Sequence, residues 1–319
     1  MAAKRSPIGS VLVTLLLLLT ATGCNPLRPR AILHGGYRVA PELLTMNQPQ
    51  IERGRPCVVV DSVGWFVGIP GRLLLWDPRI DNHQISKQTE GLLTAYLMDN
   101  ELSHVKVRLN QYAPLQDWKR LRNNKTVGWG YRYTLGVLSL AGETLLPGRI
   151  FGGDRYNPYT ATIHLYSDVP AIAMHEAAHA KDFSRRKWQG TYAAVYLLSP
   201  APLWHERIAT SDVLYYTTVK QDDQLQREAY RILYPAYGTY VGSSLGMFLP
   251  KYADPLYITS VLVGHAAAHH HAYALPELMY LSQNSEASSQ PAEVHAVAYD
   301  EPMPELPGES IPLSQILWP

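Results

Sequence analysis

The sequence predicts an α+β fold in which a small mixed sheet packs among helices and a helical, apolar region follows. Short alternating or β-branched segments predict the strands, and apolar residues at helical spacing predict the helices. The 319 residues, 46% of them apolar, suffice for one large or two modest domains. A formal net charge of +1 argues against a strongly basic nucleic-acid-binding protein, so no nucleic-acid partner is expected.

The amino-terminal residues resemble the signal peptide of a bacterial lipoprotein. Two basic residues precede an apolar stretch at 11–19, which is too short for a spanning helix. Residues 21–24 (Ala-Thr-Gly-Cys) resemble a lipobox, although an ordinary secretory signal that contains a cysteine is the alternative. The resemblance implies removal of residues 1–23, a lipid anchor at Cys24 and a periplasmic location in the cell envelope. Asn25, rather than Asp, favours the outer membrane.

The remaining chain divides into four regions by composition. Residues 24–55 are rich in Pro, Arg and Gly and are predicted to form a tether, whereas 56–228 are predicted to form the main folded domain. Residues 229–281 are apolar and helical, and 282–319 are predicted to be disordered. Lipidation of the first of the two cysteines leaves the other without an intramolecular disulfide partner.

Periodicity predicts the elements of the domain over 56–228. Residues 105–109 alternate between apolar and basic side chains, which indicates a half-buried strand. Leucines and a tyrosine at helical spacing predict a helix over 85–101. The complete order is short strands or a hairpin over 57–60 and 65–76, a helix over 85–101, strands over 105–109, 131–138 and 160–166, and a helix over 169–187.

The helix predicted over 169–187 carries the HExxH motif, which begins at His175 and ends at His179. Residues four apart lie on one face of a helix, so both imidazoles can reach one tetrahedral ion. Glu176 can then act as a base toward a metal-bound water, whose pKa falls to about 7, as it attacks a carbonyl. The strand over 160–166 suits an edge strand that holds an extended peptide. The motif predicts one bound Zn²⁺ ion.

A catalytic zinc ion usually has three protein ligands, and a second helical segment downstream offers Glu206. Together with HExxH and the element order, this segment resembles the gluzincin clan of zinc metallopeptidases over residues 85–215. In that clan a crossing helix supplies a glutamate to the metal. The resemblance implies a zincin-like core of helix, small mixed sheet, HExxH helix and crossing Glu helix, with Glu206 as the third ligand.

Two other residues are alternative ligands, namely His205 and Asp182. Neighbouring helical residues point about 100° apart, so only one of His205 and Glu206 can face the ion. Asp182 is expected to hydrogen-bond a ligand or the crossing helix instead. Many relatives place an aspartate four residues after the glutamate to orient a ligand histidine. Thr210 holds that position here, and Asp212 is a weaker candidate for the same task.

Several features outside the motif have both a functional and a structural interpretation. Three tyrosines flank the site elements, namely Tyr192, Tyr215 and Tyr216. One of them could donate a hydrogen bond to an oxyanion, and Tyr216 is the candidate for this role. A histidine cluster near the end of the apolar region could load metal or simply form the polar end of a helix. Its members are His265, His269, His270 and His271.

The apolar region contains glycines at 238, 242 and 246, a spacing that allows two helices to pack closely. Pro235 and Pro250 limit the stretch to about 14 residues, short of the roughly 20 needed to cross a membrane. The sequence therefore predicts a buried or membrane-dipping hairpin rather than true spans.

Taken together, these features predict a lipid-anchored zinc metallopeptidase that acts on a peptide or protein substrate. No clamp for a free amino terminus is evident, which favours an endopeptidase. One alternative is a non-catalytic envelope lipoprotein with a zincin-like binding core, and another is a metal-storage lipoprotein that uses the downstream histidines. Glu176 favours the enzyme, because a non-catalytic protein need not keep a base.

Overall fold

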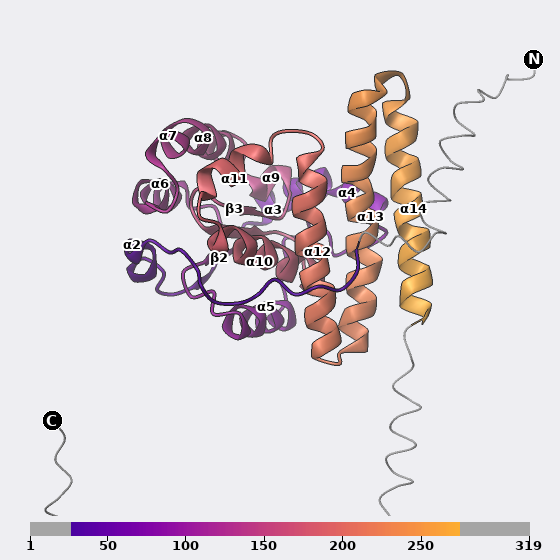
Figure 1. Ribbon diagram of the computed structural model, residues 1–319, viewed down its shortest axis with the longest axis horizontal. Coiled ribbons are helices and arrows are strands. Elements are labelled where there is room, and N and C mark those ends of the chain that lie inside the picture. Colours follow the sequence, from indigo (N-terminus) through magenta and orange to yellow (C-terminus); the bar gives the residue numbers. More distant parts are fainter. Residues whose placement is uncertain (1–26, 275–319) are drawn as a thin grey trace, which may run out of the picture. The chain divides into compact units, whose positions relative to one another are not determined.

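A four-stranded mixed sheet organises the α+β fold of this computed structural model, which describes residues 27–274 (Figure 1). The strands follow the order β1-β2-β4-β3. Strands β1 (Ile51–Arg53), β2 (Lys106–Leu109) and β4 (Thr162–Leu165) are parallel, and β3 (Arg155–Asn157) is antiparallel to β4. The predicted class and the mixed sheet are confirmed. The predicted signal peptide, Cys24 and the tail over 282–319 lie outside the described residues.

Helices surround this sheet and make up most of the described chain. They are α2 (Pro41–Thr45), α3 (Val58–Val67), α4 (Ile69–Leu75), α5 (Lys87–Asp99), α6 (Pro114–Asn123), α7 (Trp129–Tyr131), α8 (Val137–Leu145), α9 (Gly148–Phe151), α10 (Pro170–Arg185), α11 (Gln189–Val195), α12 (Ala201–Val219), α13 (Asp223–Phe248) and α14 (Ala253–Ala274). A π-helical turn spans Arg132–Gly136, and a 3-10 turn spans Pro250–Tyr252. The helices predicted over 85–101 and 169–187 are confirmed as α5 and α10.

The two central strands are buried on both faces. Strand β2 was predicted to be half-buried, but all four of its residues are inaccessible. Its basic side chains meet acids instead of solvent, because Lys106 Nζ lies 2.5 Å from the half-buried Glu52 and Arg108 Nε donates to the buried Asp117 over 2.9 Å. Helix α6 covers this face and supplies Asp117. The alternation of apolar and charged residues thus predicted the strand correctly, but it wrongly predicted that one face of the strand would be exposed to solvent.

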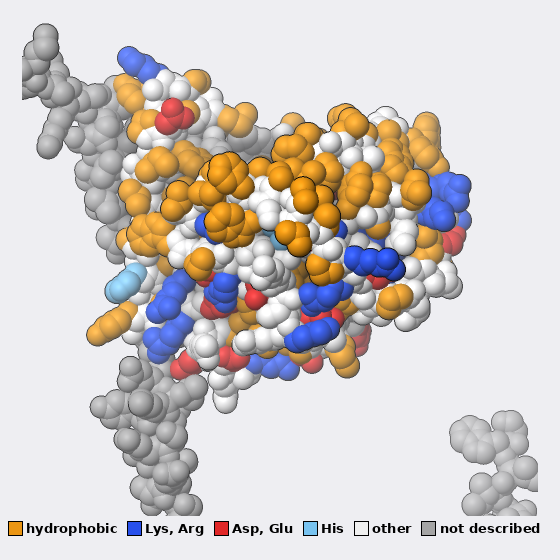
Figure 2. All heavy atoms as spheres, turned by 180° about the vertical axis from the view of Figure 1, so that it is seen from behind, with side chains coloured by type: hydrophobic (Ala, Val, Ile, Leu, Met, Phe, Trp, Pro, Cys, Tyr) orange, Lys and Arg blue, Asp and Glu red, His pale blue; other side chains and the backbone are white. Residues whose placement is uncertain are grey.

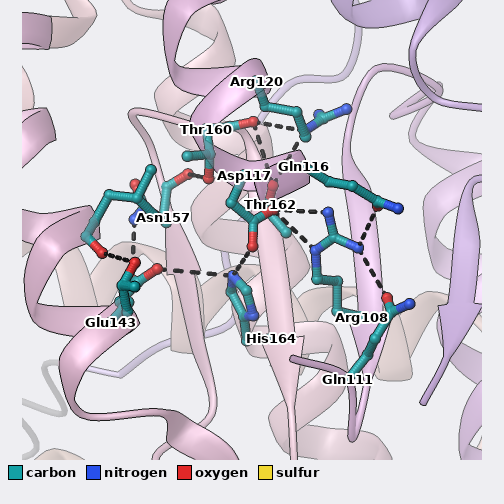
Figure 3. Close-up of polar contacts among 12 residues, drawn as sticks. Arg108, Gln111, Gln116, Asp117, Arg120, Glu143, Asn157, Thr160, Thr162 and His164 are labelled. Carbon is teal, nitrogen blue, oxygen red and sulfur yellow. Dashed lines mark hydrogen bonds and ion pairs between the residues drawn. The ribbon is translucent and has the colours of Figure 1, made fainter. Parts of the chain in front are cut away.

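A polar network on the same face joins β2, β4 and the edge strand β3 (Figure 3). Nε2 of His164 lies 3.9 Å from carboxylate oxygens of both Asp117 and Glu143. Burial and three nearby arginines hold the pKa of His164 well below its usual value, so these contacts join a neutral imidazole to the acids. Asn157 donates to Glu143 over 2.9 Å, which fixes β3 to the helix that follows the π-helical turn.

Three segments that were predicted as strands are helical. Residues 57–60 and 65–76 form α3 and α4, and residues 131–138 form α7, the π-helical turn and the start of α8. Short apolar runs do not distinguish strand from helix by periodicity alone. Tertiary contacts select the helix here, since α3 packs on α9 through Gly64, where a Cβ atom would lie 2.4 Å from the carbonyl oxygen of Arg149.

The segment predicted as a tether over 24–55 is folded from Leu27 onward. Leu27 is buried in the main core, and the backbone N–H of Arg30 donates to the carbonyl oxygen of Ser211 on α12. The segment then forms α2 and enters the sheet as β1. Pro- and Gly-rich composition argues against a long helix, but it is compatible with an extended chain whose backbone groups bond to neighbouring elements. The tether prediction is therefore wrong for residues 27–53.

Helices α13 and α14 pack along each other as a hairpin at the carboxyl end of the described chain (Figure 1). A Cβ atom on Gly238 would lie 2.5 Å from the carbonyl oxygen of Ser260, and one on Gly242 would lie 2.5 Å from Cα of Tyr257. The glycine spacing therefore serves close helix packing, as predicted. Among residues 27–274 no single helix is long and apolar enough to cross a membrane, although α3 and α4, bent by 47°, satisfy length and composition as a pair.

Pro235 does not end the helix that contains it, contrary to the sequence-based limit of about 14 residues. It lies inside α13, which is 26 residues long. Gly264 on α14 faces it, and a Cβ atom there would lie 2.7 Å from Cα of Pro235. Because α14 offers no side chain at this point, the two helices stay in contact past the proline.

Candidate metal centre

Helices α10 and α12 bring three potential ligands together. Helix α10 begins with Pro170, directly after the turn that leaves β4, and His175 and His179 lie one turn apart on its face toward α12. From α12, Oε2 of Glu206 lies 2.9 Å from Nε2 of His175 and 3.4 Å from Nε2 of His179. The two Nε2 atoms are 3.1 Å apart. This is the set that the sequence predicted.

The donor set fits a small tetrahedral cation. All three ligand atoms lie within 4.8 Å of one another, and each residue is at most 9% exposed. Ligand atoms about 2.0–2.1 Å from one tetrahedral ion are themselves about 3.3 Å apart, close to the separations observed. Two imidazoles and one carboxylate suit zinc among the common metals, whereas magnesium and calcium prefer oxygen ligands only. Within residues 27–274 this is the one such group.

The electrostatics of the group also suit a cation. Burial alone lowers the pKa of His179, but the charges of Glu206 and Glu176 outweigh it and raise that pKa to about 9. Burial alone raises the pKa of Glu206, but the two histidines hold it well below its usual range. Without a metal, a proton on the His179 imidazole thus balances the negative charge of the Glu206 carboxylate. A cation bound here replaces that proton, so metal binding releases protons.

Glu176 lies beside the group and faces a cavity of about 450 Å³. It is 8% exposed, and burial raises the pKa of its carboxyl, partly opposed by the charges of His179 and His175. His179 and Glu206 also line this cavity. An acid–base group with a raised pKa therefore lies next to the potential ligands in a space large enough for part of a peptide.

The strand along this cavity is β3, not the predicted 160–166 segment. Residues Arg155, Tyr156 and Asn157 line the cavity, whereas β4 is paired on both sides, with β2 and with β3. The segment 160–166 does form a strand, but it is interior and cannot accept another strand. Strand order depends on contacts between distant segments, which local periodicity does not contain.

The alternative ligands face elsewhere. His205 is 1% exposed and is surrounded by the rings of Tyr192, Tyr196, Trp204 and Phe183, and neither of its ring nitrogens has a hydrogen-bond partner. Burial lowers its pKa to about 4. Asp182 contacts Arg186 and accepts a hydrogen bond from the Tyr192 hydroxyl. The structure therefore groups Glu206, rather than His205 or Asp182, with the HExxH histidines.

Thr210, not Asp212, contacts a ligand histidine. Oγ1 of Thr210 lies 3.5 Å from Nδ1 of His175, the nitrogen that points away from the ligand group. Asp212 instead accepts from Lys181 Nζ at 2.9 Å, from the Tyr96 hydroxyl, and from the backbone N–H of Ile32. Its contacts tie four segments of the fold together. Asp182 and Asp212, which were predicted to orient the metal ligands, therefore bind other residues instead.

The tyrosines at the group differ from those that were predicted. Tyr192 binds Asp182, Tyr215 is 42% exposed, and the Tyr216 hydroxyl donates to Asp99. Two others, Tyr196 and Tyr240, line the cavity.

The Tyr196 hydroxyl donates to Oε1 of Glu206 over 2.6 Å, and Tyr240 lines the same cavity as Tyr196 and Glu206. Burial, followed by the charge of Glu206, raises the pKa of both phenols, so both are proton donors. Tyr196 could have been suspected, since it lies between the two ligand-bearing helices. Nothing in the sequence links Tyr240 to them.

The downstream histidines make contacts within the fold. Nε2 of His265 lies 2.9 Å from the carbonyl oxygen of Leu74, and its ring stacks on Trp76. His271 stacks on Tyr230, and His269 on Tyr273. These contacts favour the interpretation of the cluster as a helix end that packs against its neighbours.

Comparison of the chain with protein-family models, curated proteins and solved structures finds no match. The function is therefore inferred from the site itself.

Proposed function

We propose that the protein is a zinc-dependent peptidase with a gluzincin-type site and a zincin-like core. One observation carries the proposal: two imidazoles and a carboxylate converge within 4.8 Å, beside a buried glutamate that faces a cavity. His175, His179 and Glu206 would hold the ion. A bound zinc ion supplies Lewis acidity, which acidifies water and polarises a carbonyl.

The chain's own residues have distinct tasks in this proposal. Glu176 takes the proton of the attacking water and delivers it to the leaving amine, and its raised pKa brings it closer to neutral pH, where such transfer is most efficient. Tyr196 donates its hydroxyl hydrogen to Glu206 and so holds that carboxylate in place, while Tyr240 adds a second phenol to the cavity lining. Thr210 contacts the far nitrogen of His175 and so limits rotation of that ring.

Strand β3 is suited to hold the substrate. It is the edge of the sheet next to Glu176, a position at which an extended peptide can add as a further strand. Leu135, Leu138 and Leu197 line the same cavity. This lining supports a preference for an apolar side chain next to the cleaved bond. The sequence shows no clamp for a free amino terminus, which supports endopeptidase action.

The proposed location follows from the amino-terminal sequence. The lipobox-like residues 21–24 support lipidation of Cys24 and attachment to the bacterial cell envelope on its periplasmic side, with the outer membrane favoured by Asn25. A peptide or protein in that compartment is the proposed substrate.

The decisive experiment compares the parent with Glu176→Gln. The amide keeps the shape of the side chain but cannot accept a proton, so hydrolysis should fall by about 10²–10⁴ while one zinc ion per chain is retained. A peptide library read by mass spectrometry supplies the substrates. If the parent binds zinc but cleaves no peptide, the alternative of a non-catalytic binding lipoprotein replaces the peptidase.

A further inference from the structure

Helices α3 and α4 direct their charged groups inward and their apolar side chains outward. Between Val58 and Leu75 the only charged residues are Asp61 and Arg72. Asp61 accepts from Arg149 Nε over 2.7 Å, and Arg72, 8% exposed, donates to the carbonyl oxygen of Ile80 over 3.0 Å. An amphipathic helix at an aqueous surface has the opposite arrangement.

The inner side of this helix pair is formed by its smallest residues. Gly64 and Gly68 are buried, and a Cβ atom on Gly68 would lie 2.6 Å from Cβ of Asp81. The large side chains are consequently left outside. Five of them are 68–82% exposed, namely Val58, Val59, Phe66, Leu73 and Trp76.

The exposed surface continues onto the neighbouring elements. Helix α9, which packs on α3, adds Phe151, and the end of α8 adds Leu145 and the following Leu146, all more than half exposed. Figure 2 shows apolar side chains spread across the upper part of this side of the molecule. We define the apolar face as the exposed apolar side chains of α3, α4 and the following Trp76, together with those of α9, the end of α8 and the following Leu146. Contiguous patches of this kind mark interaction sites.

Two observations favour lipid as the occupant of the apolar face. Helices α3 and α4 together meet the length and composition of a membrane segment, bent by 47°, which suits helices that enter one side of a bilayer. Trp65 and Trp76 on this face, 49% and 68% exposed, are of the residue type enriched at membrane interfaces.

The amino terminus supplies an independent argument. The predicted lipid anchor at Cys24 lies only three residues before Leu27, which is buried in the core. Three residues span at most about 10 Å, so an anchored chain keeps its folded body at the bilayer. The carboxyl-terminal residues 282–319 are another possible occupant of the apolar face. They contain acidic residues and neither lysine nor arginine, so they match an apolar surface less well than lipid does.

We propose that the apolar face docks on the surface of a lipid bilayer, with α3 and α4 lying at the boundary between headgroups and acyl chains. Asp61 and Arg72 then stay in the protein, and the exposed Val, Phe, Leu and Trp side chains enter the lipid. This contact is separate from the acyl anchor and does not depend on the metal site.

Vesicle flotation tests the docking. The chain from residue 25 onward lacks the predicted signal peptide and lipid but keeps every described residue, and it is mixed with phosphatidylcholine vesicles. The parent should float with the vesicles. Loss of three outward side chains should lower its partition at least tenfold, whereas a matched triple on α5, α6 and α12 should leave it unchanged. The two variants are Val59→Ser/Phe66→Ser/Leu73→Ser and Met98→Ser/Leu115→Ser/Val219→Ser.

Three outcomes overturn the proposal. A parent that does not float, a first triple variant that floats as the parent does, or an equal loss in both variants would each show that the face does not dock on lipid. Sedimentation equilibrium without vesicles examines the competing occupant. A non-floating parent dimer that the first triple variant converts to a monomer would assign the face to a second copy of the chain. Matching circular dichroism spectra ensure that all variants are folded.

Discussion

Nε2 of His175 lies 2.9 Å from Oε2 of Glu206, although the two residues are 31 positions apart in the chain. The contact joins α10 to α12 across their packing interface. It leaves the neighbouring His205 in an aromatic enclosure, where neither ring nitrogen has a partner. The facing of one helix therefore decides which of two adjacent potential ligands can reach a metal.

Glu206→Ala should abolish tight zinc binding. Two histidines alone form a weak site, so we expect zinc affinity at neutral pH to fall by more than about 100-fold, beyond the 10–100-fold typical for loss of an outer-shell partner. His205→Phe and Asp182→Ala should retain most of the affinity. Titration against a competing chelator measures all three. Loss of zinc from His205→Phe, with normal binding by Glu206→Ala, would replace the proposed site with a three-histidine one.

Tyr196→Phe should weaken the site without removing a ligand. Its hydroxyl donates to Oε1 of Glu206 over 2.6 Å, and loss of this bond frees the carboxylate to rotate. We expect zinc affinity to fall by about 10–100-fold. Tyr192→Phe is the matched control, because that hydroxyl binds Asp182 rather than a candidate ligand. Equal zinc affinity in Tyr196→Phe and the parent would mean that Glu206 is held by other contacts.

The sequence was sufficient for features that depend on local spacing. His175 and His179 lie one turn apart because of helical periodicity, and the same periodicity predicted α5. Helix geometry indicated that only one of His205 and Glu206 could face the ion, and the choice of Glu206 came from the resemblance to the gluzincin clan. These inferences needed only the positions of residues within one element or two.

Features that depend on tertiary contacts were not predictable. The segment over 160–166 formed a strand, but its interior position follows from pairing with β2 and β3. Residues 57–76 have strand-like composition, but they form α3 and α4, and Gly64 packs against α9. Tyr240 reaches the site from α13, a helix whose sequence signals only its packing against α14. In each case the deciding partner lies far away in the chain.

Asp212→Leu should destabilise the fold without affecting the metal. Its carboxylate accepts from Lys181 Nζ at 2.9 Å, and both side chains are at most 5% exposed. Removal of one partner leaves a buried charge, which typically costs about 3–5 kcal/mol of unfolding free energy, whereas Lys181→Met/Asp212→Leu should recover much of this loss. Urea unfolding of the single and double variants measures the effect. Zinc loss from the folded single variant would instead link Asp212 to the metal site.

Asp81→Asn should stabilise the protein at neutral pH but not in acid. Burial, followed by the charge of Asp154, raises the pKa of Asp81 from 3.8 to about 6, although Gly153 N–H donates to its Oδ1 over 3.0 Å. The folded state therefore favours the protonated carboxyl, and stability is lost as pH rises from about 4 through 6. Asparagine is neutral throughout, so the gain should be near zero at pH 4 and about 1–3 kcal/mol at pH 7.5.

Asp61→Asn provides the control of opposite sign. Burial of Asp61 would raise its pKa, but hydrogen bonds from Arg149 and the backbone of Cys57 outweigh it and lower the pKa below its usual value. Its contribution to stability is present above the unfolded-state pKa and is lost as pH falls through the folded one. Asp61→Asn should therefore destabilise the protein at pH 7.5 and have less effect at pH 3. Urea unfolding with a chelator present excludes any contribution from bound metal.

If Asp81→Asn lowers stability equally at both of its pH values, Asp81 is ionised in the folded protein and the expected sign is wrong.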